Sequence, residues 1–121
     1  MEYKLSDRVS AMRSIASDSF ALCYAIKANP FLAKVMSELT DRLEVCSPGE
    51  LEICIAENIA PEIILISGVN KTAETIERAL DYGVRLFTAE SVKHIRLLQA
   101  AAADKRVSVR VFLRLSSGRT D

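Results

Sequence analysis

The chain has 121 residues, which suits one domain, and half of them are hydrophobic. Lysine and arginine number 16, as do aspartate and glutamate, so the formal net charge is zero. This balance does not indicate a nucleic-acid partner or an anionic membrane surface. The N-terminus is polar, unlike a signal peptide, and no apolar run reaches the ~18 residues of a membrane span, so we expect a cytoplasmic protein.

Hydrophobic spacing and turn residues divide the chain into alternating helices and strands. The spacing predicts helices over residues 6–17, 30–39, 48–56, 72–83 and 91–103. Runs rich in strand-forming residues predict strands over residues 20–27, 43–46, 62–67, 84–89 and 107–116. A strand followed by a helix, repeated in this way, is typical of βαβ units and a parallel sheet.

Several helix ends have specific signals. Ser6 and Thr72 are suitable N-cap residues, and Gly83 is a typical C-terminal stop. Ser47 and Glu50 have the spacing of a capping box around Pro48 at the first helical position. We therefore expect Ser47 and Glu50 to act as caps and not as catalytic groups.

Two architectures fit this alternation, a (β/α)8 barrel and an open doubly wound sheet. The first strand-to-helix turn lacks G-x-G-x-x-G, which disfavours a dinucleotide fold. A complete barrel needs about 250 residues, and five strands are a little over half of one. We therefore interpret residues 1–121 as about five βα units, the N-terminal portion of a longer α/β protein.

Lys27 ends the most distinctive stretch, LCYAIKANP. Strand alternation puts Phe20, Leu22, Tyr24 and Ile26 on one face and Lys27 on the other, beside small residues. A partly desolvated amine at the carboxyl end of such a strand can act as a nucleophile toward an aldehyde. The alternative is a lysine that ends the strand and extends into water.

Polar residues follow the other four strands as well. The acidic Glu44 shares a strand face with Cys46 and can approach Lys27, although a solvated glutamate fits the spacing equally. Arg114 alternates with the aliphatic residues of the last strand and is expected to face inward, unless that strand is an edge with a solvated face. Polar residues without an assigned role at these strand ends are Ser67, Asn70, Lys71, Thr88, Glu90, Ser91 and Ser116.

Histidine and cysteine give little support to other chemistries. His94, the one histidine, is expected on a helix surface, which disfavours a serine or cysteine triad. The cysteines are Cys23, Cys46 and Cys54, an odd number without a C-x-x-C pair. We expect three buried thiols, without a disulfide framework or a metal site.

Five motifs together resemble the N-terminal half of fold-type III pyridoxal-phosphate (PLP) enzymes, which include diaminopimelate, ornithine and arginine decarboxylases and, more distantly, alanine racemases. In chain order the motifs are YAIKANP, EVCSPGEL, ISGVNKT, TAES and FLRLSSG. The resemblance covers nearly the whole chain, and the third motif resembles the diaminopimelate type more than the ornithine type. It implies a PLP-binding (β/α)8 (TIM) barrel whose second half, with a C-terminal β-domain, is absent from these residues.

The resemblance also implies roles for three residues. Lys27 matches the lysine that forms the Schiff base with PLP and is the implied catalytic residue. Glu44 stands where the family usually has an aspartate near the cofactor, and Arg114 matches an arginine beside it. Lys27, Glu44 and Arg114 are thus the implied cofactor-binding residues, and no metal is implied.

The implied activity is that of a PLP-dependent amino-acid decarboxylase, a lyase of amino-acid metabolism that acts as a homodimer on a small-molecule substrate. A racemase, a non-catalytic PLP-binding protein and an inactive fragment that serves only in assembly remain alternatives. Residues 1–121 alone are expected to be inactive, to bind PLP weakly or not at all, and to self-associate through exposed strand edges.

Overall fold

The computed structural model describes residues 2–16, 21–26, 30–68 and 71–114. Their helices are α1 (Glu2–Ala16), α2 (Ala33–Leu39), α3 (Pro48–Ala56), α4 (Ala73–Tyr82) and α5 (Val92–Lys105), with short 3-10 helices η3 (Pro30–Leu32) and η4 (Pro61–Ile63). Their strands are β1 (Cys23–Ala25), β2 (Arg42–Val45), β3 (Ile64–Ile66), β4 (Leu86–Ala89) and β5 (Arg110–Leu113). None of the described helices is both long and apolar enough to cross a membrane.

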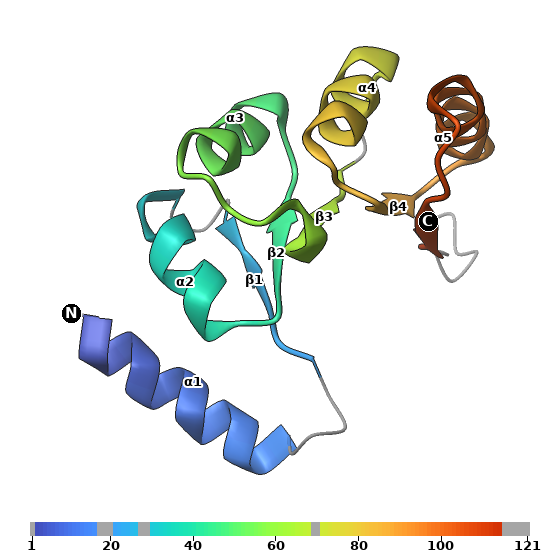
Figure 1. Ribbon diagram of the computed structural model, residues 1–121. Coiled ribbons are helices and arrows are strands. Elements are labelled where there is room, and N and C mark those ends of the chain that lie inside the picture. The colour runs from blue at the N-terminus through green and yellow to red at the C-terminus, as the bar shows by residue number, and fades with distance from the viewer. Residues whose placement is uncertain (1, 17–20, 27–29, 69–70, 115–121) are drawn as a thin grey trace, which may run out of the picture.

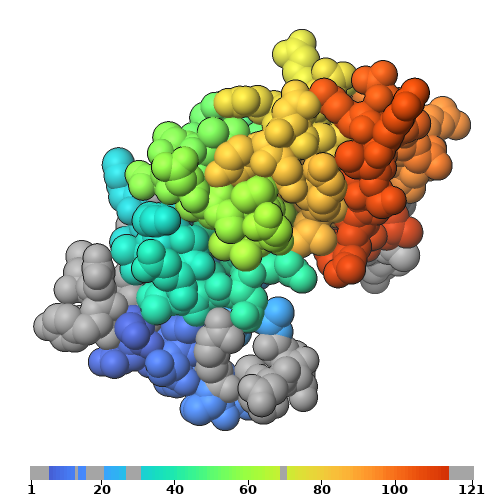
Figure 2. Space-filling view, viewed as in Figure 1, coloured from blue at the N-terminus to red at the C-terminus, as the bar shows by residue number. Residues whose placement is uncertain are grey.

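The five strands form one parallel sheet in the order β1-β2-β3-β4-β5. This order follows the chain without reversal, as in a barrel, whereas a doubly wound sheet reverses at a switch point. Helices α2 to α5 lie on one face of the sheet and leave the other face open (Figure 1). Figure 2 shows the same progression across the molecular surface, from blue α1 at one end to the red-orange C-terminal unit at the other. The predicted α/β architecture is therefore confirmed.

Strand register separates the two faces of the sheet. On the helix-covered face, Val45 pairs with Ile66 and Ile66 with Phe87, and each of the three side chains is at most 2 % exposed. On the open face, the register places Glu44 beside Leu65. Apolar burial against the helices thus fixes which side chains face the open side, because a one-residue slip would exchange the two faces.

The last strand follows its predicted division into faces. Val109, Val111 and Leu113 line a groove together with Ile95 and other residues of α5. On the opposite face Phe112, which pairs with Thr88, is 43 % exposed. The aliphatic face therefore meets the helix layer, as the sequence predicted.

Helix α1 begins earlier than predicted. It starts at Glu2, so Ser6 lies inside the helix and is not its N-cap. Val9 is buried, whereas the apolar side chains of Met12 and Ile15 are 54 % and 87 % exposed. The prediction was wrong because the residues before Ser6 are themselves adequate helix formers, and serine is tolerated within a helix.

Two strands are shorter than predicted for local reasons. Pro61 begins the 3-10 turn η4, in which the Ile63 N–H donates to the Ala60 carbonyl, so β3 starts only at Ile64. Before β5, Val107 still belongs to the C-terminal turn of α5, because its N–H donates to the Ala102 carbonyl. The ends of the predicted strands at residues 20, 27, 115 and 116 lie outside the described residues.

The predicted caps are confirmed where they concern α3 and α4. The Ser47 hydroxyl accepts from the Glu50 N–H at 3.2 Å, and Oε1 of Glu50 accepts from the Cys46 N–H at 3.0 Å. The Thr72 hydroxyl accepts from the Thr75 N–H, and Gly83 ends α4 in the left-handed region with φ of 114°. These caps fix where each helix begins relative to the strand before it.

Candidate active site at the carboxyl ends of the strands

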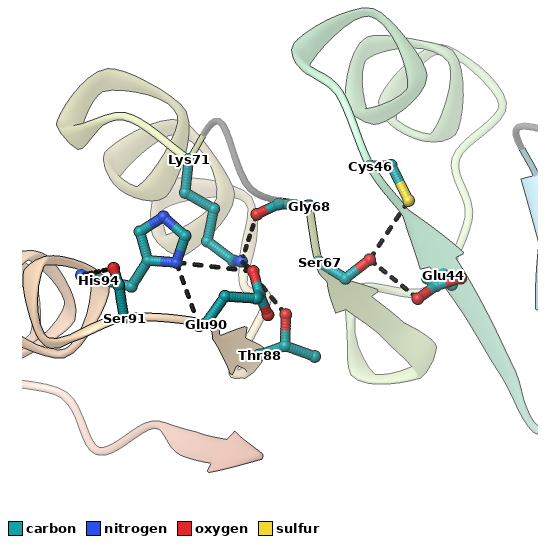
Figure 3. A network of polar contacts seen from close by, with 9 residues as sticks. All are labelled: Glu44, Cys46, Ser67, Gly68, Lys71, Thr88, Glu90, Ser91 and His94. Carbon is teal, nitrogen blue, oxygen red and sulfur yellow. Dashed lines mark hydrogen bonds and ion pairs between the residues drawn. The ribbon is translucent and has the colours of Figure 1, made fainter. Parts of the chain in front are cut away.

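The carboxyl ends of β2, β3 and β4 carry two neighbouring groups of polar side chains (Figure 3). One group joins Glu44 and Cys46 of the β2 segment to Ser67, which follows β3. The other joins Lys71, Thr88 and Glu90 across the turns that follow β3 and β4. In a parallel barrel, ligands bind at this end of the strands. The carboxyl ends of these strands are therefore the candidate site.

Glu44 is positioned by Ser67. The Ser67 hydroxyl donates to Oε2 of Glu44 at 2.9 Å and lies 3.2 Å from the Cys46 sulfur. Ser67 is 3 % exposed, and its backbone N–H donates to the Val45 carbonyl at 2.8 Å, which continues the sheet ladder. The carboxylate of Glu44 is thus held at the strand ends by a side chain whose own backbone is fixed.

Gly68 allows the ends of β2 and β3 to approach each other. Its φ is +105°, a conformation that side chains other than glycine rarely adopt. A Cβ atom added at Gly68 would lie 2.8 Å from the Cys46 carbonyl oxygen. Glycine at this position therefore allows the turn after β3 to pass close to the Cys46 backbone.

Lys71 is the most deeply buried charged group among the described residues, with a side chain only 1 % exposed. Its ammonium group donates to the Gly68 carbonyl at 2.7 Å, to the Thr88 hydroxyl at 3.1 Å and to Oε1 of Glu90 at 2.8 Å. A lysine ammonium has three protons to donate, so all three are used. The Lys71 amine is therefore committed to structure and is not available as a nucleophile.

Glu90 is the counter-ion of Lys71. Burial alone would raise the pKa of Glu90, but the hydrogen bonds of Lys71 and Thr88 and the charge of Lys71 together lower it. Oε2 of Glu90 is buried and accepts no hydrogen bond from a described residue. Glu90 is thus held ionised by Lys71 in a partly buried position.

His94 is buried, contrary to the predicted surface position. It is 5 % exposed, and its Nδ1 accepts from the Glu90 N–H at 3.2 Å. The backbone N–H of His94 donates to the Ser91 hydroxyl, which caps α5. The prediction was wrong because His94 lies in the first turn of α5, where the chain folds back over the Glu90 side chain.

Arg114 lies just beyond β5 and is exposed. Its backbone N–H donates to the Ala89 carbonyl at 2.9 Å, so alternation places it on the open face with Phe112. The described contacts do not connect its side chain to Glu44 or Glu90. Lys27, the predicted nucleophile, and Asn70 lie outside the described residues.

The three cysteines differ in environment, although the sequence predicted that all would be buried. Cys54 is fully buried, Cys46 is partly buried, and Cys23 is exposed. Burial, with a smaller effect of the Glu50 charge, raises the pKa of Cys54 to about 11. Cys23 is exposed because it starts β1 on the open face, which no helix covers. No three acidic, cysteine or histidine side chains in the described ranges are arranged to hold a metal ion.

Sequence reasoning did not identify Ser67, Lys71 and Glu90 as connected. Each stood at a predicted strand end, which was the available signal. Their pairing depends on how far each turn folds back over the sheet edge, and residue spacing does not fix that distance.

Comparisons with known proteins agree with this geometry. Residues 3–121 match the family model described as pyridoxal-dependent decarboxylase, pyridoxal binding domain. The diaminopimelate decarboxylase of Pseudomonas aeruginosa is 35 % identical over 105 residues, which are 85 % of this chain and 25 % of that protein. The diaminopimelate decarboxylase of Aquifex aeolicus is 32 % identical over 114 residues, 93 % of this chain and 27 % of that protein. The chain thus spans about a quarter of the length of these relatives.

Solved structures give the same result. A crystal structure of the protein AQ1208 from Aquifex aeolicus matches with a TM-score of 0.80 and 30 % identity, over 93 % of this chain and 28 % of that one. Diaminopimelate decarboxylase from Helicobacter pylori, complexed with L-lysine, matches with a TM-score of 0.76 and 25 % identity, over 91 % and 29 %. The chain therefore belongs to the family of pyridoxal-dependent decarboxylases, whose pyridoxal-binding-domain model residues 3–121 match.

Proposed function

We propose that this chain is the N-terminal part of a PLP-dependent amino-acid decarboxylase similar to diaminopimelate decarboxylase. The observation that carries the proposal is the carboxylate of Glu44, held by Ser67 at the carboxyl end of β2 on the open face of the sheet. In this proposal Lys27 joins PLP as a Schiff base, and residues 1–121 are a partial barrel domain that a second barrel half and a β-domain complete.

The side chains at the strand ends suit this cofactor. A Schiff base to lysine carries positive charge when protonated, and a nearby carboxylate stabilises that form. Glu44 supplies such a carboxylate, and Arg114 supplies a cation for the anionic groups of the cofactor. Because all protons of Lys71 have acceptors, Lys71 does not compete with Lys27 for the aldehyde.

Each residue has a defined role in the proposal. PLP, when bound, supplies an electron sink for the carbanion that loss of CO2 leaves on an amino acid. Lys27 would hold the cofactor through its amine and would give it up to the substrate amine. Glu44 would hold a proton at the Lys27 nitrogen, and Arg114 would balance the negative charge of the cofactor. The proposed substrate is a free amino acid, and the proposed assembly is a homodimer.

The test is the visible absorbance that appears when PLP joins a lysine in the complete protein that carries this sequence. We expect the band in the wild-type protein and in Lys34→Ala, since Lys34 is an exposed lysine on α2. Lys27→Ala is expected to lack it. Release of CO2 from candidate amino acids, measured against racemisation, then separates a decarboxylase from a racemase. An unchanged band in Lys27→Ala would overturn the proposed role of Lys27.

A further inference from the structure

The contacts of Ser67 define a direction for two hydrogen bonds. A serine hydroxyl has one proton, and two acceptors lie near it, the Glu44 carboxylate at 2.9 Å and the Cys46 sulfur at 3.2 Å. A bond to an ionised oxygen is stronger than one to sulfur, so the proton lies toward Glu44. The Cys46 thiol must then donate its own proton to the Ser67 oxygen. The order of donation is Cys46 to Ser67 to Glu44, and we call these two successive hydrogen bonds the relay.

The backbone on both sides of this relay is anchored. The Cys46 N–H donates to Oε1 of Glu50, the carboxylate of the α3 capping box, at 3.0 Å. The Ser67 N–H donates to the Val45 carbonyl at 2.8 Å. Gly68 lets the turn after Ser67 pass close to the Cys46 carbonyl. The thiol and the hydroxyl are therefore held in place, and the carboxylate of Glu44 is the part that they orient.

We propose that Ser67 is a positioning residue, which fixes the carboxylate of Glu44 at the candidate site and keeps the Cys46 thiol as a hydrogen-bond donor. Residue spacing assigns no role to Ser67, and Glu44 is longer by one methylene than the aspartate usual in the family. A longer carboxylate has one more rotatable bond, so it gains more from a fixed donor. The link from Glu44 to the lysine-bound cofactor rests on the proposed function.

The relay itself is tested without cofactor, by infrared spectroscopy of the S–H stretch. Subtracting the spectrum of Cys46→Ala from that of the parent isolates the Cys46 band. We expect Ser67→Ala and Glu44→Gln to move this band to higher frequency, because the thiol loses or weakens its acceptor. Ser67→Thr keeps the hydroxyl and is expected to restore the parent frequency. Ser108→Ala, an exposed serine at the opposite ends of the strands, is the matched control.

A second measurement tests whether the position of the Glu44 carboxylate affects the cofactor bound to Lys27. In the complete PLP-treated protein, the pH midpoint of the visible band is expected to fall in Ser67→Ala and to return in Ser67→Thr. An unchanged S–H frequency in Ser67→Ala would overturn the proposal. A shifted frequency with an unchanged midpoint would overturn the positioning role. If the wild-type protein never forms the band, the proposed function fails, and the infrared result still decides whether the relay exists.

Discussion

Lys71 and Glu90 form an ion pair at the carboxyl ends of β3 and β4. Nζ and Oε1 are 2.8 Å apart, and the two side chains are only 1 % and 15 % exposed. The pair joins the turn after β3 to the turn after β4 (Figure 3). A buried pair is favourable only where further hydrogen bonds compensate the loss of water. Gly68 and Thr88 supply these bonds to Lys71.

Removing the cation of this pair is expected to destabilise the fold strongly. Lys71→Met leaves the Glu90 carboxylate buried without its partner, at an expected cost of about 3–5 kcal/mol in the free energy of unfolding. The double variant Lys71→Met with Glu90→Gln is expected to recover part of this loss, because no charge remains buried. Urea unfolding gives both values. If Lys71→Met lowered the free energy of unfolding by less than about 1 kcal/mol, Glu90 would not need Lys71 as its buried counter-ion.

The same pair predicts a pH dependence of stability. The pKa of Glu90 is lower in the folded protein than the ordinary value of about 4.3. The contribution of ionised Glu90 is therefore fully present above about pH 4.3 and is lost as the pH falls through its lower folded value. Unfolding curves of wild type and Glu90→Gln should differ most near neutral pH and converge in acid. A difference that grows toward low pH would contradict the assignment.

Two glycines give a matched pair of substitutions. In Gly68→Ala the new Cβ atom would lie 2.8 Å from the Cys46 carbonyl oxygen, and the backbone of residue 68 has a left-handed φ. We expect this substitution to destabilise the protein by about 1–3 kcal/mol. Gly49→Ala lies in the first turn of α3, where the nearest atom is 4.0 Å away, and should stabilise by up to about 1 kcal/mol. Thermal unfolding of the two variants tests this contrast. Equal effects of the two substitutions would show that backbone approach at Gly68 is unimportant.

The cysteines should react with alkylating reagents at very different rates. Cys54 is buried with a pKa of about 11, so at pH ~8 only about one thiol in a thousand is ionised. Cys23 is exposed, although burial of part of its surface and the Glu44 charge raise its pKa as well. Timed alkylation followed by peptide mass mapping should label Cys23 first and Cys54 last. Comparable rates in the folded protein would contradict the burial of Cys54.

Local signals in the sequence predicted much of the fold. The cap at Thr72 and the stop at Gly83 correctly bounded α4, and the capping box at Ser47 correctly began α3. These signals are reliable because each satisfies a specific backbone group within a few residues. The start of β5 was less accurate, because the C-terminal turn of α5 takes in Val107 and the strand then pairs with β4 over only four residues.

The candidate site was predicted only in outline. The sequence placed polar residues at the strand ends, and the structure shows which of them bond to one another. The burial of His94 was missed because the first turn of α5 folds back over Glu90. The exposure of Cys23 was missed because it depends on whether another part of the chain covers the open face of β1. The roles of Lys27, Glu44 and Arg114 remain predictions, and Lys27 lies outside the described residues.

The central claim is that Lys27 is the lysine that captures the aldehyde of PLP. The most direct measurement is borohydride reduction of the PLP-treated complete protein, which converts a lysine imine into a stable amine, followed by peptide mass mapping. We predict a single pyridoxyl group on Lys27 and none on Lys71, whose protons are all engaged. Label on Lys71, or label spread over exposed lysines such as Lys34 and Lys93, would contradict the account.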